Sequence, residues 1–207
     1  SNAFYQAVEK VEKLKNSREL FIRNLFHELN TPVTKGKILT EIVDEPKTKE
    51  MMESIFSRLS SLLKELAQME KLTSENYMLS KKPVRIRELI DEASDLLYLE
   101  EEVQTNVSAE MIEADFSSMS LVFKNLIDNA YKYGENVEIK VDSHRVCFIS
   151  SGEALSESLT YYTEAFSKGR ETGTQKGFGL GLYIVSEILK KHDMHFSYEH
   201  KSGKNIF

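Results

Sequence analysis

The residues FHELNTP at positions 26–32 place a histidine beside a carboxylate inside a helical pattern. On a helix, His27 and Thr31 lie four residues apart and share one face, so the imidazole and the hydroxyl project together. Pro32 removes the backbone donor that would bond the carbonyl group of Glu28, and we expect the helix to bend beside His27. A lone histidine on a helix is more often solvated than catalytic, so its role depends on what the rest of the sequence supplies.

Apolar residues at spacings of three and four run on both sides of this stretch, from about residue 4 to residue 43, and predict one long amphipathic helix. A polar break at 44–47 precedes a second run with heptad spacing, made of Met52, Ile55, Leu59, Leu62, Leu66 and Met69. Two such helices form an antiparallel hairpin, which cannot cover both of its seams by itself. We predict that the hairpin dimerises into a four-helix bundle; the alternative is a hairpin that docks on the downstream domain.

Turn and cap residues end this periodicity and predict a domain boundary near residues 74–80. We therefore divide the chain into a helical hairpin at 4–77 and a mixed domain at 78–207, which makes the fold class α+β. A polar stretch at 150–176 predicts a long loop of the kind that forms lids. The other elements expected in the second domain are strands at 83–86, 103–107, 111–114, 137–141, 145–149 and 195–199, and helices at 87–98, 116–133 and 177–192.

Composition excludes several classes of function. The 207 residues carry a net charge of −6 with both signs interspersed, so neither nucleic-acid binding nor a polybasic membrane contact is expected. No run of eighteen apolar residues predicts a membrane span. The single Cys147 suits a reducing compartment and a small apolar role. Residues 1–3 look like the remnant of a cleaved expression tag, and we expect the natural protein to continue upstream.

A polar stripe interrupts the helix predicted at 116–133. Asn125, Asn129 and Lys132 recur at i, i+4 and i+7, although asparagine is a poor residue for a helix interior. An amide oxygen can ligate a hard cation without adding a charge that repels phosphate, and a lysine one turn further can balance phosphate charge. The plain alternative is a solvated helix face.

Three alternate glycines in GFGLGL, residues 177–182, lead into the last predicted helix. They expose consecutive backbone amides and allow phosphate oxygens to approach a helix N-terminus. The spacing differs from the dinucleotide-binding fingerprint, which also follows directly on a strand. A glycine cluster alone is weak evidence for a phosphate site.

Taken in order, these stretches resemble the motifs of sensor histidine kinases of bacterial two-component systems. FHELNTP resembles the H-box, usually HELRTP, with Asn30 in the place of arginine. The stretch at 121–133 resembles the N-box, and GFGLGL resembles the G2 box. The resemblance covers residues from about 17 to 207, and four segments in the family's order are more specific than any one of them.

Two further motifs of the family are present in altered or partial form. In SSGEAL, where the family has its G1 box, Gly152 remains, but Ser150 occupies the place of an aspartate and Ala154 that of a second glycine. In EAFSK, Phe166 and Lys168 are the recognisable members of the F-box. The missing carboxylate predicts weaker recognition of adenine than is usual in this family.

The resemblance implies a helical hairpin that dimerises into a four-helix bundle, followed by an α/β sandwich ATP-binding domain of the histidine-kinase type. It implies ATP and Mg²⁺ as cofactors, and a homodimer that transfers a phosphoryl group to the receiver domain of a response regulator. It also implies the cytoplasmic core of a receptor of the bacterial inner membrane, with membrane contact only through segments absent from this chain.

The resemblance assigns roles residue by residue. His27 accepts the γ-phosphoryl group, Glu28 accepts its proton, and Thr31 supports dephosphorylation of the regulator. The metal is assigned to Asn125 and Asn129, and the nucleotide to these two and to Lys132, Tyr133, Ser150, Gly152, Phe166, Lys168, Gly177, Gly179, Leu180, Gly181 and Leu182.

Three alternatives remain open. A chaperone-type or topoisomerase-type ATPase shares the nucleotide motifs but lacks a phosphoacceptor hairpin. A non-catalytic dimeric signalling module is favoured only by the altered SSGEAL segment. A phosphatase-dominant sensor relies on Thr31 to orient a water molecule.

Overall fold

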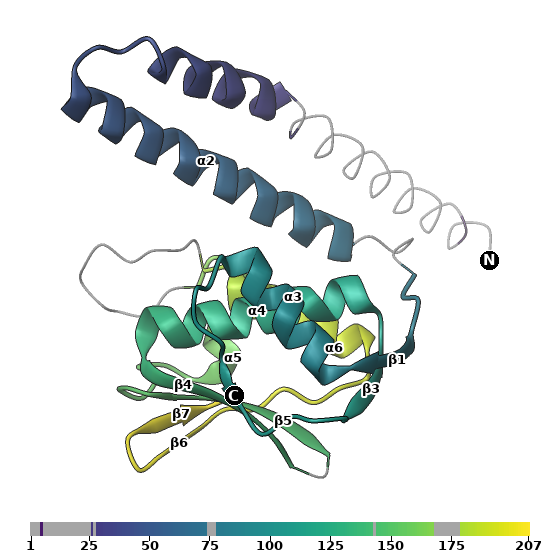
Figure 1. The fold of residues 1–207 in the computed structure, drawn as a ribbon. Helices are drawn as coiled ribbons and strands as arrows, with labels where there is room; N and C mark the ends of the chain where they lie inside the picture. Colours follow the sequence, from purple (N-terminus) through teal and green to yellow (C-terminus); the bar gives the residue numbers. More distant parts are fainter. Residues whose placement is uncertain (1–4, 6–25, 27, 74–77, 143, 168–178) are drawn as a thin grey trace. The chain divides into compact units, whose positions relative to one another are not determined.

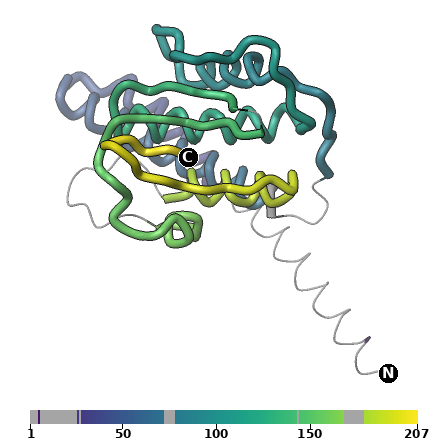
Figure 2. The backbone as a smooth tube through the Cα atoms, turned by 90° about the horizontal axis from the view of Figure 1, so that it is seen from below, coloured from purple at the N-terminus to yellow at the C-terminus, as the bar shows by residue number. Residues whose placement is uncertain are grey.

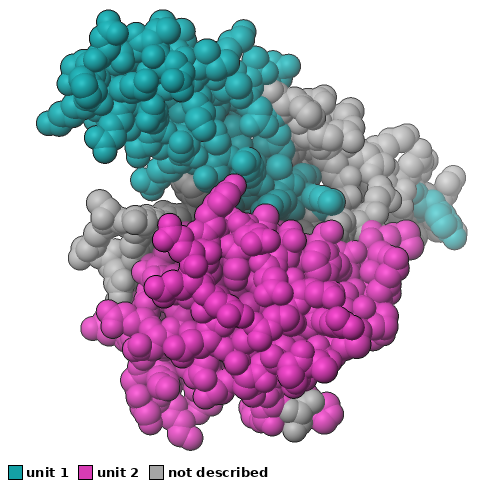
Figure 3. Space-filling view, in the orientation of Figure 1, with its two compact units in different colours: residues 1–77 teal, residues 78–207 magenta. Residues whose placement is uncertain are grey.

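The computed structural model describes residues 5, 26, 28–73, 78–142, 144–167 and 179–207, and the chain divides into two compact units (Figure 3). The first unit comprises residues 1–77 and the second residues 78–207. The first is helical and the second contains all the described strands (Figure 1). The predicted α+β fold class is confirmed.

In residues 28–73, the first unit has two helices joined by a short turn. Residues 28–40 are helical, and α2 spans Pro46–Thr73. Pro46 suits the first position of a helix, where its missing N–H is not needed. Glu45 caps this end, because its carboxylate accepts hydrogen bonds from the backbone N–H groups of Lys47 at 3.3 Å and Thr48 at 2.7 Å.

The two helices pack closely at Gly36. A Cβ atom on Gly36 would lie 2.2 Å from the ring of Phe56, so only glycine allows this approach. Leu63 is buried on the same helix as Phe56. Neither residue belongs to the predicted heptad seam, of which Ile55 and Leu59 are exposed. The sequence therefore revealed an apolar seam but not which of two neighbouring stripes on α2 faces the other helix.

The second unit is built on a five-stranded sheet of order β2-β4-β5-β7-β6, with a separate pair of β1 and β3. β2 runs parallel to β4, and the other neighbours are antiparallel. The strands are β1 Lys82–Arg85, β2 Gln104–Thr105, β3 Met111–Ala114, β4 Glu135–Asp142, β5 Arg145–Ser151, β6 Glu199–Lys201 and β7 Lys204–Ile206.

Three helices cover one face of this sheet (Figure 1 and Figure 2). They are α3 Ile86–Leu97, α4 Phe116–Tyr133 and α6 Gly181–Lys191, and a short α5 spans Leu159–Tyr162. α4 packs against α3, α6 and the sheet, so it forms the centre of the core. Its Phe123 meets Phe148 of β5 edge-on, with ring centroids 5.0 Å apart.

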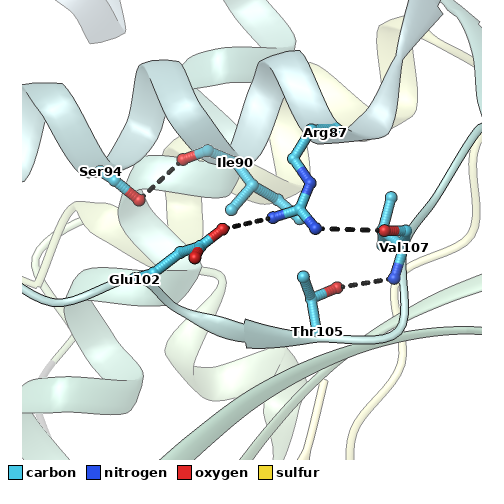
Figure 4. A network of polar contacts seen from close by, with 6 residues as sticks. All are labelled: Arg87, Ile90, Ser94, Glu102, Thr105 and Val107. Carbon is cyan, nitrogen blue, oxygen red and sulfur yellow. Dashed lines mark hydrogen bonds and ion pairs between the residues drawn. The ribbon is translucent and has the colours of Figure 1, made fainter.

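Arg87 of α3 binds the segment at 102–107, which follows this helix (Figure 4). Its guanidinium group donates to the carboxylate of Glu102 at 3.1 Å and to the carbonyl oxygen of Val107 at 3.2 Å. The backbone N–H of Val107 in turn donates to the hydroxyl of Thr105 at 3.0 Å. These contacts support β2, which is shorter than the strand predicted at 103–107.

Several predicted elements need correction. The strand predicted at 195–199 is wrong, because β6 begins only at Glu199. Phe196 and Tyr198 instead direct their rings to Phe207, with centroids 6.1 and 4.9 Å away. The loop predicted at 150–176 begins too early and contains α5, since β5 continues through Ser151.

Candidate functional site

The polar stripe predicted on α4 lies on a well-anchored helix. Asp115 caps α4 by accepting from the backbone N–H of Ser118 at 3.0 Å, and it also accepts from that of Ser80 at 3.1 Å. Partial burial raises the pKa of Asp115, but these hydrogen bonds, the Ser118 hydroxyl and the nearby His192 together hold it below the ordinary value.

His192 joins the end of α6 to the start of α4. Its Nε2 atom accepts from the backbone N–H of Asp115 at 3.1 Å, so its Nδ1 atom carries the proton and donates to the carbonyl oxygen of Ile188 at 2.9 Å. The ring is buried. Sequence reasoning missed Asp115 and His192, although an aspartate directly before a predicted helix is a recognisable capping signal.

The two asparagines of α4 lie beside the first residue of α6. Asn125 is only 8% exposed, and its Nδ2 atom donates to the carbonyl oxygen of Leu121 at 2.9 Å. A Cβ atom on Gly181 would lie 3.6 Å from Oδ1 of Asn125 and 4.0 Å from Nδ2 of Asn129. The structure thus brings these two amides and the N-terminus of α6 together.

Lys132, predicted to meet phosphate, is paired within α4. Its Nζ atom lies 2.6 Å from the carboxylate of Asp128, and Nζ of Lys124 lies 3.9 Å from the same oxygen atom. The side chains of Lys132 and Asp128 remain 33% and 21% exposed. Asp128, which has no role by resemblance, therefore holds the lysine on this face of the helix.

Gly179 brings the glycine-rich segment against residues 166–167. Its φ of +74° favours glycine, and a Cβ atom there would lie 2.4 Å from the carbonyl oxygen of Ser167 and 2.9 Å from the carbonyl carbon of Phe166. Phe166 itself has a φ of 66° and an exposed ring. The described parts of the two predicted motifs are therefore neighbours in space.

Leu180 and Leu182 are core residues. Leu180 is fully buried and Leu182 is 9% exposed. Their side chains anchor the start of α6, so any contact with a ligand at these positions falls to their backbone groups. This burial explains why leucine alternates with glycine in GLGL, residues 179–182.

The end of α4 contacts the end of β5. A Cβ atom on Gly134 would lie 2.7 Å from Oγ of Ser150, and one on Gly152 would lie 2.9 Å from the carbonyl oxygen of Tyr133. Ser150 is 5% exposed and lies within β5 rather than in a loop. Tyr133, Ser150 and Gly152 are thereby brought together.

The remaining predicted site residues lie in the first unit or outside the described residues. His27, Lys168 and Gly177 lie outside the described residues. Glu28 and Thr31 are exposed residues of the helix at 28–40, in the first unit.

The donor set on α4 fits a hard cation. Amide oxygens are suitable ligands for Mg²⁺ and add no negative charge beside a phosphate. Within the part of the chain that the structure describes, no cluster of three or more His, Cys, Asp or Glu side chains offers another metal site. The same described residues contain no helix long and apolar enough to span a membrane.

Comparison with known proteins identifies relatives of this chain. Residues 114–207 match the family described as histidine kinase-, DNA gyrase B-, and HSP90-like ATPase. The sensor histidine kinase ArsS of Helicobacter pylori is 32% identical over an alignment of 213 positions that covers 100% of this chain and 50% of ArsS. The sensor protein kinase WalK of Staphylococcus epidermidis is 26% identical over 216 residues, covering 90% of this chain and 35% of WalK.

Solved structures share the fold. Full-length ShkA in complex with AMPPNP aligns with a TM-score of 0.67 and 21% identity, over 89% of this chain and 43% of ShkA. The Acinetobacter baumannii histidine kinase AdeS aligns with a TM-score of 0.55 and 20% identity, over 87% of this chain and 94% of AdeS. The chain spans about half the length of ArsS, the curated relative with 32% identity.

Proposed function

The chain belongs to the sensor histidine kinases of bacterial two-component systems, and we propose that it transfers the γ-phosphoryl group of ATP to His27. The observation that carries this proposal is the meeting of Asn125 and Asn129 with Gly181 at the start of α6. Neutral amide oxygens and a helix N-terminus are both suited to a metal–triphosphate group.

The second unit would bind the nucleotide between the end of α4, the start of α6 and the end of β5. Asn125 and Asn129 would hold Mg²⁺, which supplies charge neutralisation on the phosphate oxygens. Lys132, held by Asp128 in the free protein, would turn to the phosphates. The base would lie near Tyr133, Ser150 and Gly152.

The transfer step would use the residues of the first unit. The Nδ1 proton of His27 passes to Glu28, and the Nε2 atom forms a bond to the γ-phosphorus while the bond from that phosphorus to the oxygen of ADP breaks. The histidine must be neutral to attack. The phosphoryl group would then pass to an aspartate on the receiver domain of a response regulator.

Dimerisation is part of this proposal. The described residues of α2 leave Met51, Ile55 and Leu59 at 61%, 50% and 39% exposure, along one helix face. A second copy of the hairpin would cover them and complete a four-helix bundle. We place this core in the cytoplasm, attached to the membrane by segments outside this chain.

The direct test uses γ-labelled ATP with Mg²⁺. The protein should acquire an acid-labile, alkali-stable label, and His27→Gln should abolish it. His144→Gln is the matched control, because His144 is exposed at the turn between β4 and β5. Label that persists in His27→Gln, or that disappears in His144→Gln, would sink the assignment.

A phosphatase-dominant sensor is the second candidate. The observation that favours it is Ser150, which lies where the family's base-reading carboxylate would be. Thr31, exposed one turn beyond His27, could then orient a water molecule. Thr31→Ala should lower dephosphorylation of the regulator while autophosphorylation continues; equal loss of both activities would count against a separate role.

A further inference from the structure

The loop that follows β5 is held by residues 198–205. Gly152 donates its backbone N–H to the carbonyl oxygen of Gly203 at 3.0 Å, and the carbonyl oxygen of Gly152 lies 3.1 Å from Nε2 of His200. Two further contacts reach the loop from Tyr198 and Asn205. These four polar contacts come from β6, β7, their turn or the segment before them, so this hairpin helps to define where the loop lies.

Tyr198 and Asn205 form a hydrogen-bonded relay. The Tyr198 hydroxyl accepts from the backbone N–H of Leu155 at 2.9 Å and donates to Oδ1 of Asn205 at 2.7 Å. Nδ2 of Asn205 donates to the carbonyl oxygen of Glu153 at 3.0 Å. Both ends of the amide are used, which fixes its orientation, and the side chain is 7% exposed.

Packing places the hydroxyl of Tyr198. Its ring lies 4.9 Å from the ring of Phe207, whose backbone pairs with that of Phe148 in β5. The hydroxyl is therefore directed by a rigid aromatic contact as well as by its two hydrogen bonds. A relay of this kind in a partly buried environment is stronger than the same bonds in water.

The relay adjoins the proposed base site. Asn205 pairs with Ser150 in the register of β5 and β7. A Cβ atom on Gly152 would lie 3.2 Å from Nδ2 of Asn205 and 2.9 Å from the carbonyl oxygen of Tyr133. Gly152 therefore packs against both residues. A movement of the loop would therefore alter the space between the end of α4 and the end of β5.

We propose that Tyr198 and Asn205 are positioning residues that set residues 152–155 against the nucleoside part of ATP. This inference rests on the proposed function. Ser150 at the end of β5 and Ala154 in the loop stand where the related motif has a carboxylate and a glycine, and the relay defines the loop's position without either. The phosphates, by contrast, are assigned to α4 and α6, away from these contacts.

The contrast between base and phosphate supplies the test. Calorimetry would measure the dissociation constants of Mg-ATP and of Mg-tripolyphosphate for the full chain. Tyr198→Phe removes one hydroxyl and keeps the ring, and should weaken ATP binding about five- to tenfold. Tripolyphosphate binding should remain unchanged, because it makes no contact with the loop.

Asn205→Asp is the second variant, since it keeps the acceptor for Tyr198 and loses the donor to Glu153. This variant should also weaken the binding of ATP and leave the binding of tripolyphosphate unchanged. Tyr98→Phe is the matched control, because Tyr98 is 90% exposed on the same unit, and it should alter neither ligand.

The outcomes separate the two proposals. Equal weakening of ATP and tripolyphosphate would indicate a general loss of structure and overturn the positioning role. Unchanged ATP binding in both variants would overturn it as well, while leaving the kinase proposal intact. Failure of the unmodified chain to bind ATP would overturn the kinase proposal and this inference with it.

Discussion

The two units bury their apolar residues in different ways. In the second unit, side chains from all three main helices and the sheet close one core, with Leu89, Ile127, Ile139 and Ile188 fully or almost fully buried. Its exposed large apolar and aromatic side chains are spread over several elements, and several are tyrosines. In the first unit, the exposed large apolar residues of α2, Met51, Ile55 and Leu59, follow one face of that helix. The second unit covers its core with its own elements, whereas the described residues of the first expose the apolar face that the proposed dimer would cover.

The largest expected effect tests that face. Ile55→Asp combined with Leu59→Asp would bury two unpaired charges in the dimer interface and should weaken dimerisation about a thousandfold or more. Light scattering at micromolar concentration should show the mass fall by half. ATP binding should persist, because the proposed nucleotide site lies within residues 78–207.

Ser57→Asp with Ser61→Asp is the control for that experiment. Both serines are exposed on α2, and the pair adds the same charge away from the apolar face. This variant should remain dimeric. A monomeric mass for the unmodified chain would contradict the contrast between the two units.

The second largest effect is expected on ATP binding, at the close approach of Gly179 to the backbone of residues 166–167. Gly179→Ala should weaken ATP binding about tenfold or more, because it combines the strain of a φ of +74° with a collision at the backbone of Ser167. Gly203→Ala is the matched control, since Gly203 has the same φ of +74° and open space around it. Equal effects of the two substitutions would show that backbone strain alone acts at Gly179.

The third effect is on stability. Asp115→Ala removes the cap of α4 and should lower the free energy of unfolding of the second unit by about 1 kcal/mol, measured by urea titration. Asp115→Asn should retain most of the cap. Loss of stability in the helical hairpin instead would contradict the assignment of this cap to the second unit.

Acid provides a separate check on Asp115. Because the pKa of Asp115 is lower in the folded protein, the stability from its ionised form is complete above its ordinary pKa of 3.8. This stability is lost as the pH falls below 3.8 and passes through the lower pKa that Asp115 has in the folded protein. The stability difference between the unmodified chain and Asp115→Asn should shrink over this range.

The smallest effect restores a missing group. Ser150→Asp supplies a carboxylate where the family usually has one, and should tighten ATP binding by about 1 kcal/mol, or fivefold, in calorimetry. Its preference for ATP over GTP should widen. An unchanged affinity would mean that another group reads the base.

Local signals in the sequence predicted much of the second unit. The helix predicted at 116–133 matches α4 at both ends, because Asp115 caps it and Gly134 ends it. The alternating residues of β4 and β5 predicted their hairpin, which is slightly longer in the structure. These features depend on residues close together in the chain.

Long-range contacts explain what the sequence did not reveal. Asp115 meets His192 across 77 positions, and Leu155 meets Tyr198 across 43. Such pairs leave no periodic pattern in the sequence. The alternation of Phe196 and Tyr198 is typical of a strand, but in the structure both rings pack on Phe207. The approach of Asn125 to Gly181 was expected only from family resemblance. The functional roles of all the predicted site residues stay predictions.

The place of β7 in the sheet has a consequence for synthesis of the chain. Residues 204–206 pair with residues 149–151, which leave the ribosome more than fifty positions earlier. At roughly 5–20 residues per second, β5 waits several seconds with one edge unpaired. During that interval Leu155 and Glu153 also lack their partners Tyr198 and Asn205. The proposed base site can therefore form only after residues 198–205 have been synthesised.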